Sequence, residues 1–246
     1  MTAMEREAAA RRYLLRRKDR NINMLAALQD GLARVAAAEE DGCLLQVAGE
    51  IWQLAAENER AALRLYAQLP ADVTMLEVQA ADQAAALAQR FRPACVEFYR
   101  NAWFDGPAAE LPPLQGAEVR DLGPEQAGEL ARYYALPGAA AEALGETEAY
   151  LSGRMAVGAV FGLYLSGRLA GFAGHHQEGS IGMLTVLPEY RRQGLGAYLE
   201  RCAILRILAR GWLPFGQVAP DNAASLALQR ALGMRVSEET VCWMER

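Results

Sequence analysis

The segment that most constrains this chain is 183–196, in which an apolar strand runs directly into a basic turn and then into a helix. The apolar part is Met183 to Leu187, and the turn contains two arginines and two glycines. The helix is predicted to run from Gly194 to Arg210, and an apolar face repeats along it at helical spacing. This face is formed by Leu195, Leu199, Cys202, Leu205 and Ala209. A buried strand followed directly by an amphipathic helix indicates an α/β protein.

The turn has the features of an anion-binding site. The first turn of a helix carries unpaired amides and a partial positive charge, so that a diphosphate can be bound there. Gly194 and Gly196 let phosphate oxygens approach the backbone, while Arg191 and Arg192 add fork-shaped donors. The spacing and the missing lysine exclude a Walker loop, and the turn is not a GxGxxG dinucleotide motif.

Length and composition limit the remaining classes. The 246 residues suffice for one large α/β domain or two small ones, and 52% apolar residues allow a real core. The net charge of −5 argues against a general nucleic-acid binder. Lys18 is the only lysine and lies in a charged run near the N-terminus, which argues against a Schiff-base enzyme.

The cysteines predict neither a metal site nor a disulfide framework. Cys43, Cys95, Cys202 and Cys242 are far apart and form no CxxC pair. No signal peptide is visible, and no stretch approaches the roughly 20 apolar residues of a membrane helix. We therefore expect a cytoplasmic protein with reduced cysteines, no metal and no membrane contact.

The N-terminal part is predicted to be rich in helix. Residues 1–40 are expected to be helical because they contain many helix formers and no proline. Further elements are expected as a hairpin of 43–48 and 50–55, strands at 61–66, 73–78 and 95–104, and a helix at 80–91.

A break follows, and then a second series of elements. Three prolines and two glycines between Asp105 and Gly116 predict an interdomain linker. Beyond it we expect strands at 118–121, 180–187, 213–219 and 236–244, a hairpin of 161–165 and 169–176, and helices at 124–134, 194–210 and 222–232. Both halves contain strands, a helix and more strands, so a degenerate duplication is conceivable.

Two blocks of this second series resemble the GNAT superfamily of N-acyltransferases. The signature of that family is Arg or Gln, two residues, Gly, one residue, and Gly or Ala, matched here by Arg191, Gly194 and Gly196 after a typical Val-Leu-Pro-Glu-Tyr lead-in. Residues 217–234 are similar to the closing motif of the family, a strand followed by Asn-x-x-Ser and a short helix, with Asn222 and Ser225 at the motif positions. The sequence Gly-Trp-Leu-Pro-Phe-Gly-Gln-Val at 211–218 further resembles the glycine N-acyltransferase-like branch.

The resemblance implies a GNAT-type fold, a mixed and mostly antiparallel central sheet flanked by helices. It implies an acyltransferase domain at 117–246, preceded by a divergent, helix-rich N-terminal lobe at 1–110 that contains a small sheet and is a candidate degenerate GNAT-like half. The implied activity is N-acyltransfer, with acetyl as the expected group, from acetyl-CoA or another acyl-CoA to a primary amine. The implied cofactor-binding residues are Leu184, Thr185, Val186, Arg191, Arg192, Gln193, Gly194, Leu195, Gly196, Asn222 and Ser225.

The candidate catalytic residues are Glu178, His175 and His176. Family members often place a carboxylate at the start of the motif strand, which here is near Ser180, and Glu178 is the nearest carboxylate. Neighbouring strand residues face opposite sides, so only one of the two histidines should point at the site. A glutamate and two histidines without any role are the alternative. The tyrosine that is common in the last helix is replaced by Gln229.

A second class of function stays open. The chain could be a catalytically silent acyl-CoA-binding module with a partner-binding N-terminal lobe. For the enzyme we expect a small-molecule amine as acceptor and no nucleic acid. An exposed final strand could pair two subunits into a homodimer.

Overall fold

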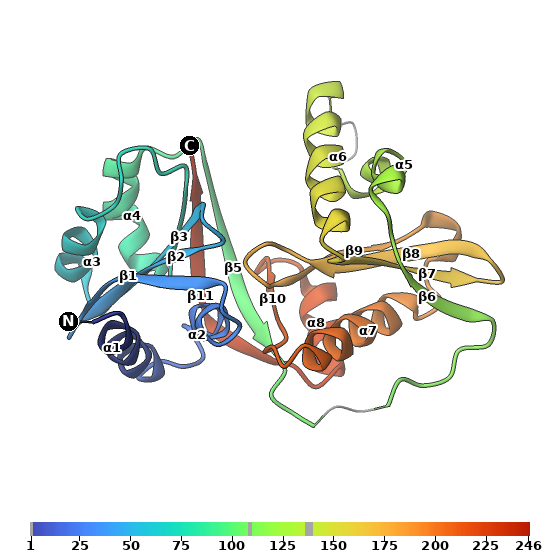
Figure 1. Cartoon of the computed structure of the whole chain (residues 1–246), viewed down its shortest axis with the longest axis horizontal. Coiled ribbons are helices and arrows are strands. Elements are labelled where there is room, and N and C mark those ends of the chain that lie inside the picture. Colours follow the sequence, from blue (N-terminus) through green and yellow to red (C-terminus); the bar gives the residue numbers. More distant parts are fainter. Residues whose placement is uncertain (1, 108–109, 136–139) are drawn as a thin grey trace. The chain divides into compact units, whose positions relative to one another are not determined.

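The computed structural model describes residues 2–107, 110–135 and 140–246. The chain forms mostly antiparallel sheet flanked by helices, so the predicted fold class is confirmed (Figure 1). Contacts divide it into two compact units. Unit 1 consists of Met1–Gly106 and Gly211–Arg246, and unit 2 consists of Pro107–Arg210.

Unit 1 has a sheet of seven strands in the order β1-β2-β3-β4-β11-β5-β10. The pair β3–β4 is parallel, and the other pairs are antiparallel. The strands are β1 (Ala33–Glu39), β2 (Gly42–Val47), β3 (Ile51–Ala56), β4 (Met75–Val78), β5 (Cys95–Trp103), β10 (Phe215–Val218) and β11 (Arg235–Glu245). The helices are α1 (Ala3–Leu15), α2 (Ile22–Gln29), α3 (Glu59–Tyr66), α4 (Ala81–Phe91) and α8 (Ala223–Ala231).

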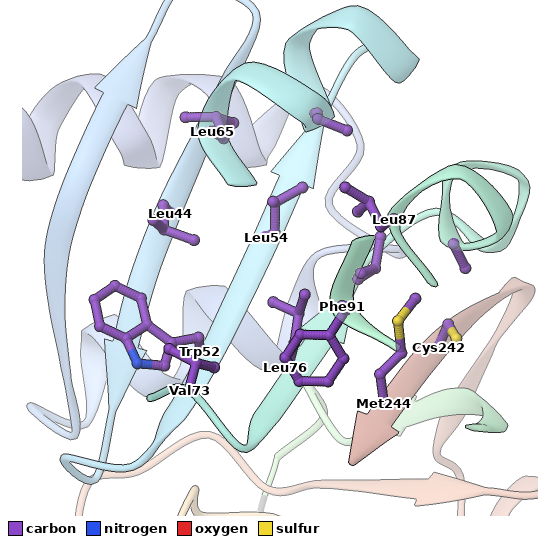
Figure 2. Packing of buried hydrophobic residues seen from close by; sticks show 14 of the residues in the cluster. Leu44, Trp52, Leu54, Leu65, Val73, Leu76, Leu87, Phe91, Cys242 and Met244 are labelled. Carbon is purple, nitrogen blue, oxygen red and sulfur yellow. The ribbon is translucent and has the colours of Figure 1, made fainter. Parts of the chain in front are cut away.

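Helices cover both faces of this sheet. Trp52 and Leu54 of β3 pack in one apolar cluster with Leu65 of α3 and Leu87 of α4 (Figure 2). Ile51, from the same strand, packs in another cluster with residues of α1 and α2. Because side chains alternate along a strand, β3 is buried over its whole length. This two-sided burial explains its almost continuous apolar sequence.

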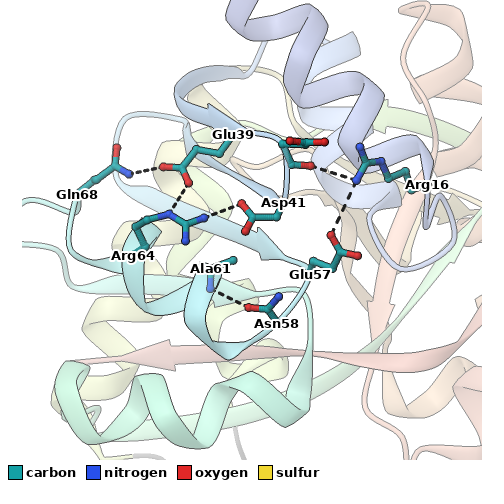
Figure 3. Close-up of polar contacts among 9 residues, drawn as sticks. Arg16, Glu39, Asp41, Glu57, Asn58, Ala61, Arg64 and Gln68 are labelled. Atoms are coloured by element: carbon teal, nitrogen blue, oxygen red, sulfur yellow. Dashed lines mark hydrogen bonds and ion pairs between the residues drawn. The ribbon is translucent and has the colours of Figure 1, made fainter.

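Two predictions for this part of the chain are wrong. Residues 33–39 form a strand instead of continuing a helix, because they pair with β2 and this tertiary pairing outweighs the helix propensity of the alanines. Residues 61–66 belong to α3 and not to a strand. The Asn58 side chain accepts a hydrogen bond from the amide of Ala61 at 3.0 Å and so starts the helix, as Figure 3 shows.

The final strand, β11, was expected to be exposed, and this expectation is also wrong. β11 is hydrogen-bonded to β4 on one side and to β5 on the other. A strand paired on both sides has no free edge. The argument for a homodimer from an exposed final strand is therefore lost.

Unit 2 has four antiparallel strands in the order β6-β7-β8-β9. They are β6 (Ala117–Asp121), β7 (Val160–Leu165), β8 (Arg168–His175) and β9 (Ile181–Val186). The helices are α5 (Ala127–Tyr134), α6 (Ala141–Ala156) and α7 (Leu195–Ala209). The hairpin, β9 and α7 match the prediction closely, whereas α6 was not predicted.

The helices of unit 2 divide between the two faces of its sheet. Phe172 of β8 packs in a cluster with Leu130 of α5 and Leu151 of α6. The neighbouring Gly171 faces the other way, since a Cβ on it would lie 2.8 Å from Cδ1 of Leu199 in α7. Strand β8 therefore separates the α5–α6 side from the α7 side.

The compact units do not follow the boundary expected from the sequence. The predicted linker, 105–116, lies partly at 108–109, outside the described residues, and residues 110–116 contain neither helix nor strand. Residues 211–246 group with 1–106, because β10 and β11 lie in the sheet of unit 1. The acyltransferase domain at 117–246 stays a prediction.

The order of elements is repeated along the chain. The series α, α, β, β, β, α, β, α, β runs from α1 to β5 and again from α5 to β11. The last strands of the two series interlock in the sheet of unit 1: β11 lies between β4 and β5, and β5 lies between β11 and β10.

The cap of α3 provides a test of this local structure. Asn58→Ala is expected to lower the free energy of unfolding by about 1 kcal/mol, because one amide of the first turn loses its acceptor. For a chain of this size the melting temperature should fall by about 2–4 °C. Asn58→Asp keeps the acceptor and should melt within about 1 °C of the wild type. Equal melting of the alanine variant and the wild type would contradict the assignment.

Candidate functional site

A pocket of about 470 Å³ lies where β9 leads to the N-terminus of α7. Its lining is Tyr133, Leu184, Thr185, Val186, Arg191, Arg192, Gly194, Leu195 and Gly196. All of these except Tyr133 are residues that the sequence predicted for cofactor binding. Most of the predicted cofactor-binding residues therefore lie around one pocket of unit 2.

The other three predicted cofactor residues do not line this pocket. Gln193 lies in the same turn and is exposed. Asn222 caps α8 in unit 1, where its side chain accepts a hydrogen bond from the amide of Ser225 at 3.0 Å. Both residues thus serve the start of α8, and a role of Asn222 and Ser225 in binding a cofactor stays a prediction.

The N-terminus of α7 is left open by the protein. Gly194 is the cap residue with φ of 79°, a conformation that favours glycine. Among the described residues, no side chain accepts a hydrogen bond from the first turn, and that turn contains no acidic residue. The first amides of the helix and its partial positive charge are thus available to an anion.

No contact with the described residues requires a glycine at position 196. A Cβ on Gly196 would meet only Cγ2 of Val186, at 4.0 Å, and the backbone there is not left-handed. Glycine costs about 1 kcal/mol relative to alanine inside a helix. The open space beside Gly196 is consistent with a ligand that comes close to the backbone.

The start of α3 differs from that of α7, because α7 has an open first turn and α3 does not. By element order α3 follows β3 as α7 follows β9. At α3, however, Asn58 caps an amide and Glu59 lies in the first turn. A carboxylate at that end of a helix disfavours a further anion. Of these two helix starts, only that of α7 is suited to bind a diphosphate.

Arg191 stabilises the turn between β9 and α7 through a hydrogen bond to the main chain. Nε of Arg191 donates to the carbonyl of Val186 at 3.1 Å. Arg192 follows with φ of 64°, in the left-handed region. Both side chains are exposed, and both line the pocket.

Strand β9 is irregular just before the pocket. Its register against β8 shifts between the partners Phe172 and Gly174, and Met183 has φ of 55°. The Met183 side chain is buried in the cluster with α5 and α6. A bulge of this kind re-aims the residues that follow it, here Leu184 to Val186, which line the pocket.

A group of polar side chains lies at the other end of β9. The Tyr150 hydroxyl is hydrogen-bonded to Nδ1 of His176, and the two rings are stacked with centroids 5.8 Å apart. The Ser180 hydroxyl donates to the carboxylate of Glu178, which is buried. Nε2 of His176 lies against Gly182, so closely that a Cβ there would overlap the ring. We call Tyr150, His176, Glu178 and Ser180 the polar cluster.

The polar cluster and the pocket lie along the same strand. Gly182 comes two residues before Leu184, which corresponds to about 7 Å along β9. Of the predicted catalytic residues, Glu178 and His176 belong to the cluster. Tyr150 was missed because its helix, α6, was not predicted.

His175 points away from the cluster, as strand alternation predicts for one of the two histidines. Its Nε2 is 3.1 Å from a guanidinium nitrogen of Arg210, and it lines a small space with Phe161 and Ile207. That space is about 10 Å³, room for one water molecule at most. Burial, followed by the charges of Arg210 and Arg154, lowers the pKa of His175 to about 3. The structure does not bring His175 to the pocket.

The charge of Glu178 affects the pKa of two tyrosines. Burial is the larger cause of the raised pKa of both Tyr134 and Tyr150, and the Glu178 carboxylate adds to it. Both phenols therefore stay protonated at neutral pH. Tyr190 is partly buried and packs against the α5–α6 cluster.

Within the described ranges, no three side chains of His, Cys, Asp or Glu form a group that could hold a metal ion. The four cysteines, all in described segments, are free thiols. No described helix is both long enough and apolar enough to cross a membrane.

Comparison with known proteins places this geometry in a wider context. Residues 157–244 match the family model described as FR47-like protein. No curated protein matches the sequence of the chain.

Solved structures share the fold at low sequence identity. A Drosophila protein is 15% identical with a TM-score of 0.68, over 100% of this chain and 96% of its own. A putative GNAT-family acetyltransferase from Novosphingobium aromaticivorans is 22% identical with a TM-score of 0.51, over 92% of this chain and 96% of its own. A tandem GNAT protein of the clavulanic acid biosynthesis pathway is 19% identical with a TM-score of 0.52, over 91% and 86%. The chain thus has the fold of GNAT acetyltransferases.

The buried neutral His175 predicts a pH dependence of stability. Its folded pKa of about 3 lies below the ordinary value of 6.5, so between these values the unfolded chain binds more protons than the folded one. Stability should therefore fall as the pH drops through this window, by up to about 1.4 kcal/mol per pH unit from this residue. In urea unfolding from pH 7 to 4, His175→Gln should lose less stability than the wild type. Parallel curves for wild type and His175→Gln would refute the assignment.

Proposed function

We propose that this protein is an acyl-CoA-dependent N-acyltransferase that moves an acyl group to a primary amine, with acetyl as the proposed group. The observation that carries this proposal is the open N-terminus of α7, with Arg191, Arg192 and Gly196 around one pocket on β9. The FR47-like match and the shared fold of GNAT acetyltransferases support it.

The residues of the pocket fit the diphosphate of coenzyme A. The amides of the first turn of α7 would hold its oxygens, and the exposed arginines would balance its charge. The backbone of Leu184 to Val186 would bind the pantetheine arm as an added strand. The open side of Gly196 leaves room for the phosphates.

The polar cluster supplies groups that can handle the proton of the amine. In the reaction the amine nitrogen bonds to the acyl carbon, the C–S bond breaks, and the sulfur keeps the electron pair and takes up a proton. A carboxylate or imidazole must accept the proton that the nitrogen loses. Glu178 and His176 are the two such groups along β9 from the pocket.

The finer assignments are part of this proposal. The glycine N-acyltransferase-like branch, acetyl-CoA as donor, a small amine as acceptor and a cytoplasmic location all rest on the sequence reasoning. The alternative of a silent acyl-CoA-binding module draws on Gln229, which stands where the family often has a tyrosine and is buried. Turnover with an amine separates the two.

Binding of the donor is tested by a matched pair of glycine variants. Acetyl-CoA at a hundred times its dissociation constant should stabilise the wild type by about 2.7 kcal/mol, a rise of roughly 5–10 °C in melting temperature. Gly196→Glu places a bulky anion in the pocket and should abolish the rise. Gly145→Glu is the control, since Gly145 is an exposed helical glycine of the same unit with no atom within 4 Å of an added Cβ.

The control variant should keep the full rise in melting temperature. If neither acetyl-CoA, CoA nor a longer acyl-CoA shifts the wild type, the proposed function fails.

Removing the carboxylate tests the chemistry separately from binding. Glu178→Gln should lower kcat by about 10²–10⁴-fold, because the amide cannot accept a proton. The shift in melting temperature with acetyl-CoA should stay the same, because Glu178 does not line the pocket. Unchanged turnover in Glu178→Gln, measured by release of free CoA thiol, would exclude Glu178 as the base.

A further inference from the structure

The orientation of His176 is determined by residues of α6 in unit 2. The guanidinium of Arg154 donates to the carbonyl of His175 at 3.1 Å and to that of His176 at 3.2 Å. This pair of bonds holds the main chain at the end of β8. One turn earlier on the same helix, Tyr150 stacks on the imidazole at an interplanar angle of 26° and is hydrogen-bonded to Nδ1.

The absence of a side chain at Gly182 makes room for the imidazole of His176. The edge that carries Nε2 occupies the space that a Cβ at position 182 would need. The imidazole therefore lies between Tyr150 and the backbone of β9, with Nδ1 toward the helix and Nε2 toward the strand.

The direction of the Tyr150 hydrogen bond decides the tautomer of His176. A phenol has one proton to donate, and a neutral imidazole has one nitrogen that accepts. Burial and the charge of Glu178 raise the pKa of Tyr150, so its hydroxyl keeps that proton. Among the described residues, Nδ1 of His176 is the only hydrogen-bond partner of this hydroxyl. The hydroxyl can donate to Nδ1 or accept from it, and donation places the ring hydrogen of His176 on Nε2.

We propose that Tyr150 is a positioning residue that holds His176 as the Nε2–H tautomer, so that His176 presents a hydrogen-bond donor over β9. This inference rests on the proposed function and divides the roles within it. A donor at this place can stabilise negative charge that develops on the acyl oxygen or the sulfur. Glu178, not His176, is then the base.

The other histidine is held in the opposite tautomer. Nε2 of His175 accepts from the guanidinium of Arg210, which leaves the ring hydrogen on Nδ1. Because the chain has only two histidines, a labelled sample should show one ring of each kind. His175 thus serves as an internal reference in the same spectrum.

The experiment is nitrogen NMR of the full chain with isotope-labelled histidine at neutral pH, with the rings assigned in His175→Gln. His176 is expected to show a protonated Nε2 and a bare Nδ1. In Tyr150→Phe, which keeps the stacked ring but lacks the hydroxyl, the two nitrogens should move toward averaged values. Tyr164→Phe is the control, since that hydroxyl bonds to Gln126 and not to a histidine.

Turnover provides a second readout for the same variants. Tyr150→Phe should lower kcat by about 10–100-fold through a misplaced donor, with the KM for acyl-CoA within about twofold of the wild type. A bare Nε2 on His176 in the wild type, or an unchanged spectrum in Tyr150→Phe, overturns the inference. The spectra decide this point even without turnover, whereas the acetyl-CoA titration decides the proposed function.

Discussion

The interlocking of β5 and β11 is the constraint on which unit 1 depends. Each of these strands is hydrogen-bonded on both sides, β11 to β4 and β5, and β5 to β11 and β10. Removing either strand would leave ladders of backbone groups unpaired in the middle of a sheet, which is costly. Residues 1–106 and 211–246 must therefore complete the sheet together, although more than a hundred residues separate β5 from β10. Closing such a loop before the contacts can form makes slow folding the expectation.

A buried carboxylate reinforces this arrangement. Glu77 of β4 is fully buried and accepts hydrogen bonds from Gln53 of β3, Asn23 of α2 and Gln217 of β10. A buried charge without such donors would be strongly destabilising. Moving any of these elements by one residue would separate Glu77 from a donor, so the network favours one register among strands from distant parts of the sequence.

The repeated order of elements does not repeat the chemistry. α3 and α7 occupy the same place in the two series, yet one helix starts with a capping asparagine and a glutamate, and the other starts with glycine beside two arginines. The shared architecture therefore does not by itself set the chemistry of these two helix starts. The same holds for the two adjacent histidines, because the alternation of β8 sends one toward α6 and the other toward α7.

The sequence by itself determined the strand–turn–helix at 183–196 and the hairpins, because the patterns that specify them lie within a few residues. The signal for α3 was also local, an asparagine before Glu59, and was missed. Only the tertiary structure decided that alanine-rich residues 33–39 form a strand, since their partner is β2. It also decided that β11 lies inside a sheet, and that Tyr150 meets His176 26 residues further along the chain. Such contacts join residues far apart in sequence, and their energy depends on packing that no local pattern contains.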